Sequence, residues 1–139
     1  MPRMRRRAIL AIPIVVPAAA LAAAQPSALA QVSGGLWEVR GVPGASGPLR
    51  QCVTDVLALA QFEHRGRNCT RRVTSDARSS TVIDYSCGAA GFGHSDISVI
   101  TPRALRIATQ GISDQLPFNY VIQAHRLGDC TKTPASSRH

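Results

Sequence analysis

Three consecutive residues, His94, Ser95 and Asp96, have the side-chain types of a base, a nucleophile and a carboxylate. Catalysis by such a set requires the serine hydroxyl to approach the histidine ring. The surrounding residues predict a strand, however, and neighbours on a strand point to opposite faces of the sheet. We therefore expect His94 and Ser95 to lie apart, and we assign no catalytic residue from the sequence.

Metal and cofactor chemistry finds equally little support. His64, His94 and His125 stand singly, with no second histidine two or four residues away. The cysteines lack the Cys-x-x-Cys spacing of a zinc site. The glycine-rich run 88–93 resembles a phosphate-binding loop only in composition, because no helix follows it to supply an anion site. We expect no metal and no cofactor.

Basic charge is concentrated in one short segment, residues 65–72, which carries Arg65, Arg67, Arg71 and Arg72 around Cys69. Guanidinium groups bind phosphate and carboxylate well, so the segment is a candidate for binding an anionic partner. The alternative, which we favour, is a solvated loop and strand edge whose charge discourages edge-to-edge aggregation.

The start of the chain has the pattern of an export signal. Arg3, Arg5, Arg6 and Arg7 precede an uncharged, Ala-rich run over residues 8–24. The small-x-small triplet 28–30 predicts cleavage after Ala30, and a cut after Ala24 is the alternative. The run is weakly apolar and interrupted by two prolines, so we expect no membrane anchor to be retained.

Removing residues 1–30 changes the composition of the functional part. The whole chain has a net charge of +8, but without the four signal arginines 12 basic residues face 8 acidic ones, a net charge of +4. Such a modest charge gives little support to nucleic-acid binding. The remaining 109 residues are enough for one domain with a modest core.

The cysteines all lie in this exported part: Cys52, Cys69, Cys87 and Cys130. An even number in an oxidising compartment predicts two disulfides. A hairpin centred on Arg78 would place Cys69 opposite Cys87 and leave Cys52 to Cys130. The other pairing joins Cys52 to Cys69 and Cys87 to Cys130. We favour the second, because bridges directly across a hairpin often carry strain.

Short strands separated by turn residues dominate the predicted elements. Six strands are expected over residues 36–40, 69–74, 81–87, 94–100, 104–112 and 118–126, with one short helix over 56–62 behind an N-cap at Thr54-Asp55. This pattern predicts a mainly β domain over residues 31–130, with an antiparallel, curved meander or small barrel-like sheet, and a disordered tail over 131–139. The expected core residues are Trp37, Val39, Ile83, Tyr85, Leu105, Ile107, Phe118, Tyr120 and Ile122.

The order of several short motifs resembles a known family. These are Gly35-Leu36-Trp37-Glu38, Cys52-Val53-Thr54, the two middle cysteines, and the closing run Arg126-Leu127-Gly128-Asp129-Cys130. Together they resemble the exported bacterial domain-of-unknown-function family numbered 3617, over nearly the whole exported part. The resemblance implies an all-β fold and export, and it brings no established activity.

These observations lead to three functional hypotheses for a periplasmic or secreted bacterial protein. The first is a non-catalytic envelope protein that binds a protein, lipid or glycan. The second is an inhibitor of a periplasmic or secreted hydrolase, acting through the loop 88–93 or 111–117. The third, a small enzyme, lacks a catalytic constellation.

Overall fold

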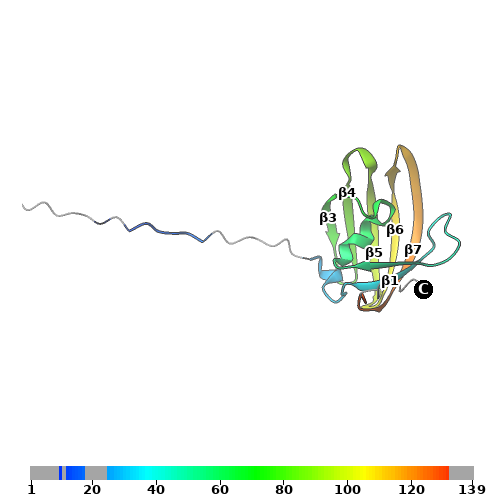
Figure 1. The fold of residues 1–139 in the computed structure, drawn as a ribbon, viewed down its shortest axis with the longest axis horizontal. Helices are drawn as coiled ribbons and strands as arrows, with labels where there is room; N and C mark the ends of the chain where they lie inside the picture. The colour runs from blue at the N-terminus through cyan, green and yellow to red at the C-terminus, as the bar shows by residue number, and fades with distance from the viewer. Residues whose placement is uncertain (1–9, 11, 18–24, 132–139) are drawn as a thin grey trace, which may run out of the picture.

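Seven antiparallel strands form one open, curved sheet in the computed structural model, which describes Leu10, residues 12–17 and residues 25–131 (Figure 1). The strands are β1 (Gly35–Arg40), β2 (Leu49–Val53), β3 (Thr70–Asp76), β4 (Ser80–Ser86), β5 (Gly91–Thr101), β6 (Ala104–Ser113) and β7 (Leu116–Gly128). Three 3-10 helices accompany them: η1 (Ser27–Leu29), η2 (Val56–His64) and η3 (Gly88–Ala90). The mainly β prediction is confirmed.

The sheet order is β2-β1-β7-β6-β5-β4-β3, so β3 to β7 form a continuous meander and β1 joins it beside β7. β2 and β3 are the two edge strands. The prediction of six strands missed β2. That strand is short, and its Leu-Arg-Gln-Cys-Val sequence lacks the clear alternation of apolar and polar residues that indicates a strand.

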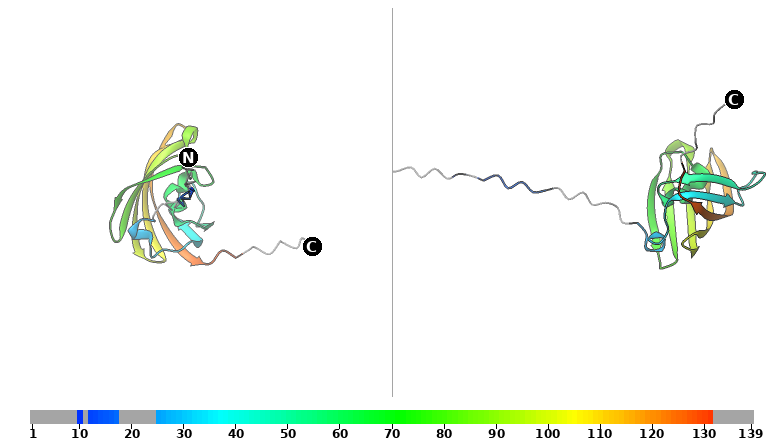
Figure 2. Two further views of the ribbon diagram at one scale, coloured as in Figure 1. Left: turned by 90° about the vertical axis from the view of Figure 1, so that its left-hand side faces the viewer. Right: turned by 60° about the horizontal axis from the view of Figure 1, so that its bottom comes forward.

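The sheet curves around η2, which covers its concave face (Figure 2). Asp55 caps η2 as predicted, because its carboxylate accepts a hydrogen bond of 2.9 Å from the Leu57 amide. Leu59 and Phe62 of η2 are buried against the inward side chains of the strands. All the predicted core residues are buried except Phe118 and Tyr120, which are half-buried at one end of the sheet.

The disulfides join Cys52 to Cys130 and Cys69 to Cys87, so the pairing that we favoured from the sequence is wrong. The register of β3 and β4 opposes Thr70 to Ser86, which brings the two middle cysteines together one residue beyond the ladder. Their Cα atoms lie 4.2 Å apart. The bridge thus closes the open end of the hairpin instead of lying between two paired strand residues. The reason given against this pairing, strain in a bridge between directly paired residues, therefore does not apply.

The chain enters the domain earlier than the predicted start at residue 31, since η1 and the residues around it pack on β4 and β5. Most of the predicted signal (residues 1–9, 11 and 18–24) and the predicted tail from residue 132 lie outside the described residues. Across the described part of the chain, no helix has the length and apolar character needed to cross a membrane.

Candidate functional site

A groove of about 700 Å³ lies across β4, β5, β6 and β7 at one end of the sheet. Its walls are side chains on the convex face of the sheet, opposite the face that η2 covers. These side chains reach the convex face because residues along a strand alternate between its two faces. On β5, Phe92 and His94 are exposed, whereas Gly93 and Ser95 are buried.

A row of polar side chains crosses the groove, one from each of four neighbouring strands. Asp84 is paired with His94, His94 with Gln110, and Gln110 with Asn119. Neighbouring strands are roughly 4.8 Å apart, so this polar row spans about 14 Å. Beyond its β4 end, Arg72 of the edge strand is paired with Asp84 and lines a smaller hollow of about 300 Å³.

A second, apolar row runs parallel to the first, two residues further along each strand. Phe92 is paired with Ile112, and Ile112 with Pro117. The Phe92 side chain is conspicuous because it is a large aromatic group that is 55% exposed. The groove therefore has one polar side and one apolar side.

The floor between the polar side and the apolar side includes two glycines, Gly93 and Gly111, which are directly opposed on β5 and β6. A Cβ atom on Gly93 would lie 2.4 Å from the Tyr85 ring, which covers the glycine from the concave side. A Cβ atom on Gly111 would lie 2.1 Å from the Phe92 carbonyl oxygen. Both positions thus require glycine, because a Cβ atom would meet the Tyr85 ring at Gly93 and the β5 backbone at Gly111.

The groove rests on a buried cluster at the same end of the sheet. His64 of η2 stands between the Tyr85 and Phe118 rings, with centroid distances of 5.5 and 5.9 Å. Its Nδ1 lies 3.2 Å from the Tyr85 hydroxyl, and its Nε2 lies 3.0 Å from the Ala90 carbonyl oxygen. Both ring nitrogens are therefore used, and His64 joins η2, β4 and η3 into one unit.

Both tyrosines of the chain belong to this end of the sheet. Burial raises the pKa of Tyr85 to about 12, although the neighbouring Thr109 hydroxyl opposes the shift. The Tyr120 hydroxyl donates a 2.7 Å hydrogen bond to Glu63 of η2. Burial raises the pKa of Tyr120 as well, and the Glu63 carboxylate adds to the effect because it accepts from the neutral phenol and repels a phenolate.

The structure separates the residues of the sequence His94-Ser95-Asp96. Ser95 is fully buried on the concave face, where its hydroxyl donates to the Ala60 carbonyl oxygen of η2 and lies 2.9 Å from the Thr109 hydroxyl. The imidazole of His94 lies on the convex face and contacts Asp84, at 2.6 Å from Nδ1 to Oδ1. The histidine ring and the serine hydroxyl are on opposite faces of the sheet, so they do not form a nucleophile and base.

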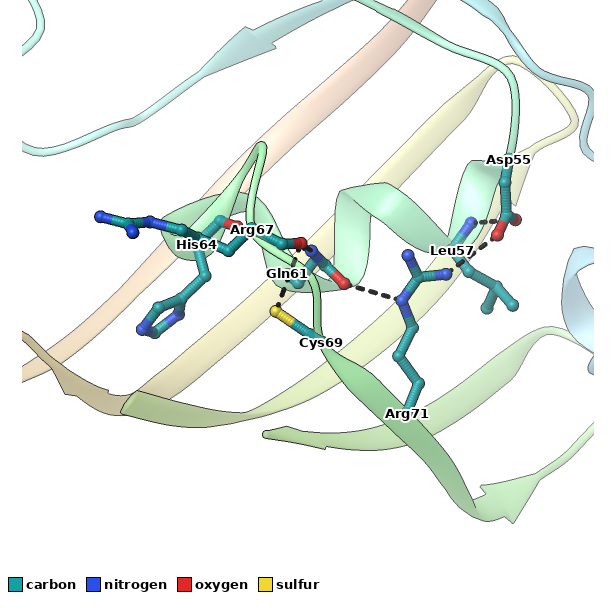
Figure 3. Close-up of polar contacts among 7 residues, drawn as sticks. All are labelled: Asp55, Leu57, Gln61, His64, Arg67, Cys69 and Arg71. Atoms are coloured by element: carbon teal, nitrogen blue, oxygen red, sulfur yellow. Dashed lines mark hydrogen bonds and ion pairs between the residues drawn. The ribbon is translucent and has the colours of Figure 1, made fainter. Parts of the chain in front are cut away.

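The four arginines of the basic segment do not act together. Arg71 donates to Gln61 at 2.8 Å and to Asp55 at 2.9 Å, so its guanidinium ties β3 to the N-cap and to the C-terminal half of η2 (Figure 3). The Arg65 guanidinium lies 4.8 Å from the Phe62 ring centroid and donates to the Phe62 carbonyl oxygen. Of the four, Arg67 and Arg72 make no side-chain hydrogen bond or ion pair with the described residues, and they line different hollows.

The three histidines considered from the sequence are also dispersed, with His64 in the buried cluster, His94 in the groove and His125 opposite Glu38 on β1. No group of three His, Cys, Asp or Glu side chains within residues 25–131 is placed to hold a metal ion.

Sequence reasoning did not single out Asp84, Gln110, Asn119 or Phe92. The signal that finds them is strand register, because the residue numbers of cross-strand partners in a hairpin have a constant sum. Applied to the turns centred on Ala89 and Pro102, this rule aligns Asp84, His94 and Gln110 in one row.

Comparisons with protein-family models, with curated proteins and with solved structures find no match to this chain.

Proposed function

We propose that this chain is an exported, non-catalytic binding protein of the bacterial envelope, and that the groove on the convex face holds a neutral saccharide. The observation that carries the proposal is the pairing of a polar row with a parallel apolar row over a glycine floor. A sugar ring has the same two-sided character, with hydroxyl groups around its rim and C–H groups on its faces.

The composition of the polar row fits hydroxyl groups. A carboxylate accepts hydrogen bonds, an amide both donates and accepts, and an imidazole can do either, so Asp84, Gln110 and Asn119 match hydroxyls in both roles. The exposed Phe92 ring and Ile112 offer an apolar surface to the sugar face. An anionic ligand is disfavoured in the groove, because its lining contains the Asp84 carboxylate and no arginine or lysine.

Export is supported by the two disulfides, which persist in oxidising compartments. Membership of the family numbered 3617 would imply the same compartment, and it stays a prediction. A binding role also agrees with the separation of His94 from Ser95, which leaves the groove with polar groups suited to recognition.

The test is a titration of the isotope-labelled protein with the N-acetylglucosamine tetramer, followed by amide chemical shifts. We expect shifts confined to β4, β5, β6 and β7 around the groove, and at least a tenfold loss of affinity in Phe92→Ser and in Asp84→Ala. The matched control is Ser98→Ala, which changes the same face outside the groove. Shifts elsewhere on the protein, or unchanged affinity in both groove variants, would overturn the proposal.

A second candidate function, inhibition of a periplasmic or secreted hydrolase, is favoured by a different observation. The two loops considered for it meet at one end of the sheet, where the Asp114 amide donates to the Ala90 carbonyl oxygen at 3.1 Å. Asp114 and Gln115 have φ angles of 47° and 69°, and the next residue, Leu116, is 70% exposed. This braced turn presents an apolar side chain to a partner.

Inhibition assays against the secreted and periplasmic hydrolases of the source cell test this second function. We expect one hydrolase to be inhibited by the protein and released by Leu116→Asp, while Phe92→Ser inhibits normally. If no hydrolase is inhibited, the second function is excluded.

A further inference from the structure

Residues 25–32, which we call the N-terminal strap, are built into the domain. Ala28 and Leu29 are fully buried, and Val32 is 5% exposed. Leu29 is among the largest side chains in the protein with no solvent exposure. The strap lies against β4 and β5, where it extends the core beyond the region that η2 covers.

Polar contacts also hold the strap in place. The carboxylate of Asp76, at the end of the edge strand β3, accepts hydrogen bonds from the backbone amides of Ser27 at 2.9 Å and Ala28 at 3.4 Å. The Ser27 amide is the main reason that the pKa of Asp76 lies below its usual value. Within the strap, the Gln25 side-chain amide donates to the Leu29 carbonyl oxygen at 3.0 Å.

A cut after Ala30 would remove these contacts from the mature protein. The core would lose Ala28 and Leu29, and the vacated space would cost stability both through lost burial and through the cavity itself. The Asp76 carboxylate would lose both of its amide donors. A cut after Ala24 keeps every one of these groups, since the strap begins at Gln25.

We infer that the export signal is cleaved between Ala24 and Gln25, so that the mature protein begins at Gln25 and has 115 residues. Water adds across this peptide bond, leaving a carboxylate on Ala24 and an amine on Gln25. The sequence Ala22-Ala23-Ala24 offers the small residues that a signal peptidase requires, as Ala28-Leu29-Ala30 does. The inference rests on export, which is part of the proposed function, and its tests do not involve saccharide binding.

The direct test is the intact mass of the protein after export of the full chain from a bacterial host. We expect the mass of residues 25–139 with two disulfides. Both candidate cuts expose a glutamine, whose cyclisation removes one ammonia in either case, so the six residues of difference remain decisive. A mature protein that begins at Gln31 would overturn the inference, and so would an uncleaved chain.

Two matched variants identify the cleaved bond independently. Ala24→Leu places a large residue immediately before the inferred bond and should block processing, so that the precursor accumulates. Ala30→Leu places the same residue before the competing bond, at a position that is exposed and tolerant of a larger side chain. It should be processed like the wild type. The reverse pattern would assign the cut to Ala30.

A third measurement reports on the strap itself. In the exported protein, Leu29→Ala should lower the melting temperature by several degrees, because Leu29 is in the core. If cleavage followed Ala30, residue 29 would be absent from the mature protein and the melting temperature would not change. The strap is on the concave side, so Leu29→Ala should leave saccharide affinity unaltered. If the exported protein begins at Gln25 but does not bind the saccharide, that result would count against the proposed function alone.

Discussion

Nδ1 of His94 lies 2.6 Å from Oδ1 of Asp84, its direct partner across β4 and β5. The carboxylate that contacts this histidine therefore comes from the neighbouring strand instead of from Asp96, two residues away in sequence. Ser95 is turned to the other face, where it bonds to η2. The two halves of an apparent catalytic motif thus have separate roles, one in the groove and one in the core.

The first prediction concerns the structural role of Ser95. Ser95→Ala removes the donor to the Ala60 carbonyl oxygen and a partner of Thr109, both in the core. We expect the free energy of unfolding to fall by about 1–3 kcal/mol, because buried polar groups lose their hydrogen bonds. Urea denaturation measures the change. The exposed Ser86→Ala is the matched control, and equal stability of the two variants would show that the Ser95 hydroxyl contributes nothing.

The second prediction concerns the glycine floor of the groove. Gly93→Ala places a methyl group where the Tyr85 ring lies, so either the ring or the strand must move. We expect a loss of about 1–3 kcal/mol in the free energy of unfolding, as is typical of overpacking. Gly47→Ala is the control, since its Cβ meets no atom within 4 Å. A Gly93→Ala protein as stable as this control would contradict the close packing of Tyr85 on β5.

The third prediction separates the two disulfides. They close loops with sequence separations of 78 and 18 residues, and a longer loop restricts the unfolded chain more. Replacing both cysteines by serine should therefore cost about 4 kcal/mol for Cys52 and Cys130, and about 3 kcal/mol for Cys69 and Cys87. Denaturant unfolding of the two double variants gives the order. Peptide mapping without reduction checks the pairing, and a Cys52–Cys69 peptide would refute it.

The sequence predicted the long, alternating strands well, because one face of each is buried and the periodicity is visible in β4, β6 and β7. It failed at β2, whose formation depends on pairing with β1 and on the nearby Cys52 bridge more than on its own pattern. Phe118 and Tyr120 share the apolar periodicity of β7, yet they are only half-buried, at the end of the sheet where they contact the last residues of η2. Periodicity identifies the face of a residue and not what covers that face.

The candidate site was less accessible from sequence for a related reason. Its polar row is assembled from four strands, and each strand contributes a single ordinary residue with no local motif. The arginines, in contrast, formed a visible local cluster, but the fold uses Arg71 to hold η2 and Arg65 to cover Phe62. Strand register brings together the residues of the polar row, which are far apart in the sequence. Tertiary contacts give different roles to the arginines, which are close together in the sequence.

The last prediction follows from the two tyrosines, which are the only ones in the chain. Folding raises the pKa of both, that of Tyr85 to about 12 against an ordinary value of 10.0. Between these values the unfolded chain loses phenolic protons that the folded protein keeps, so deprotonation favours unfolding. The resulting stability is fully present below pH 10 and declines as the pH rises from about 10 towards 12.

We therefore expect tyrosinate absorbance to stay low in the folded protein at pH 10 and to increase together with the loss of the circular dichroism signal at higher pH. In denaturant, the same two tyrosines should titrate near pH 10. Tyr85→Phe should weaken the decline of stability above pH 10, because one of the two titrating groups is gone. A native protein that forms tyrosinate at pH 10 without unfolding would show that the Tyr85 and Tyr120 hydroxyls are open to solvent, and that the cluster beneath the groove is not closed.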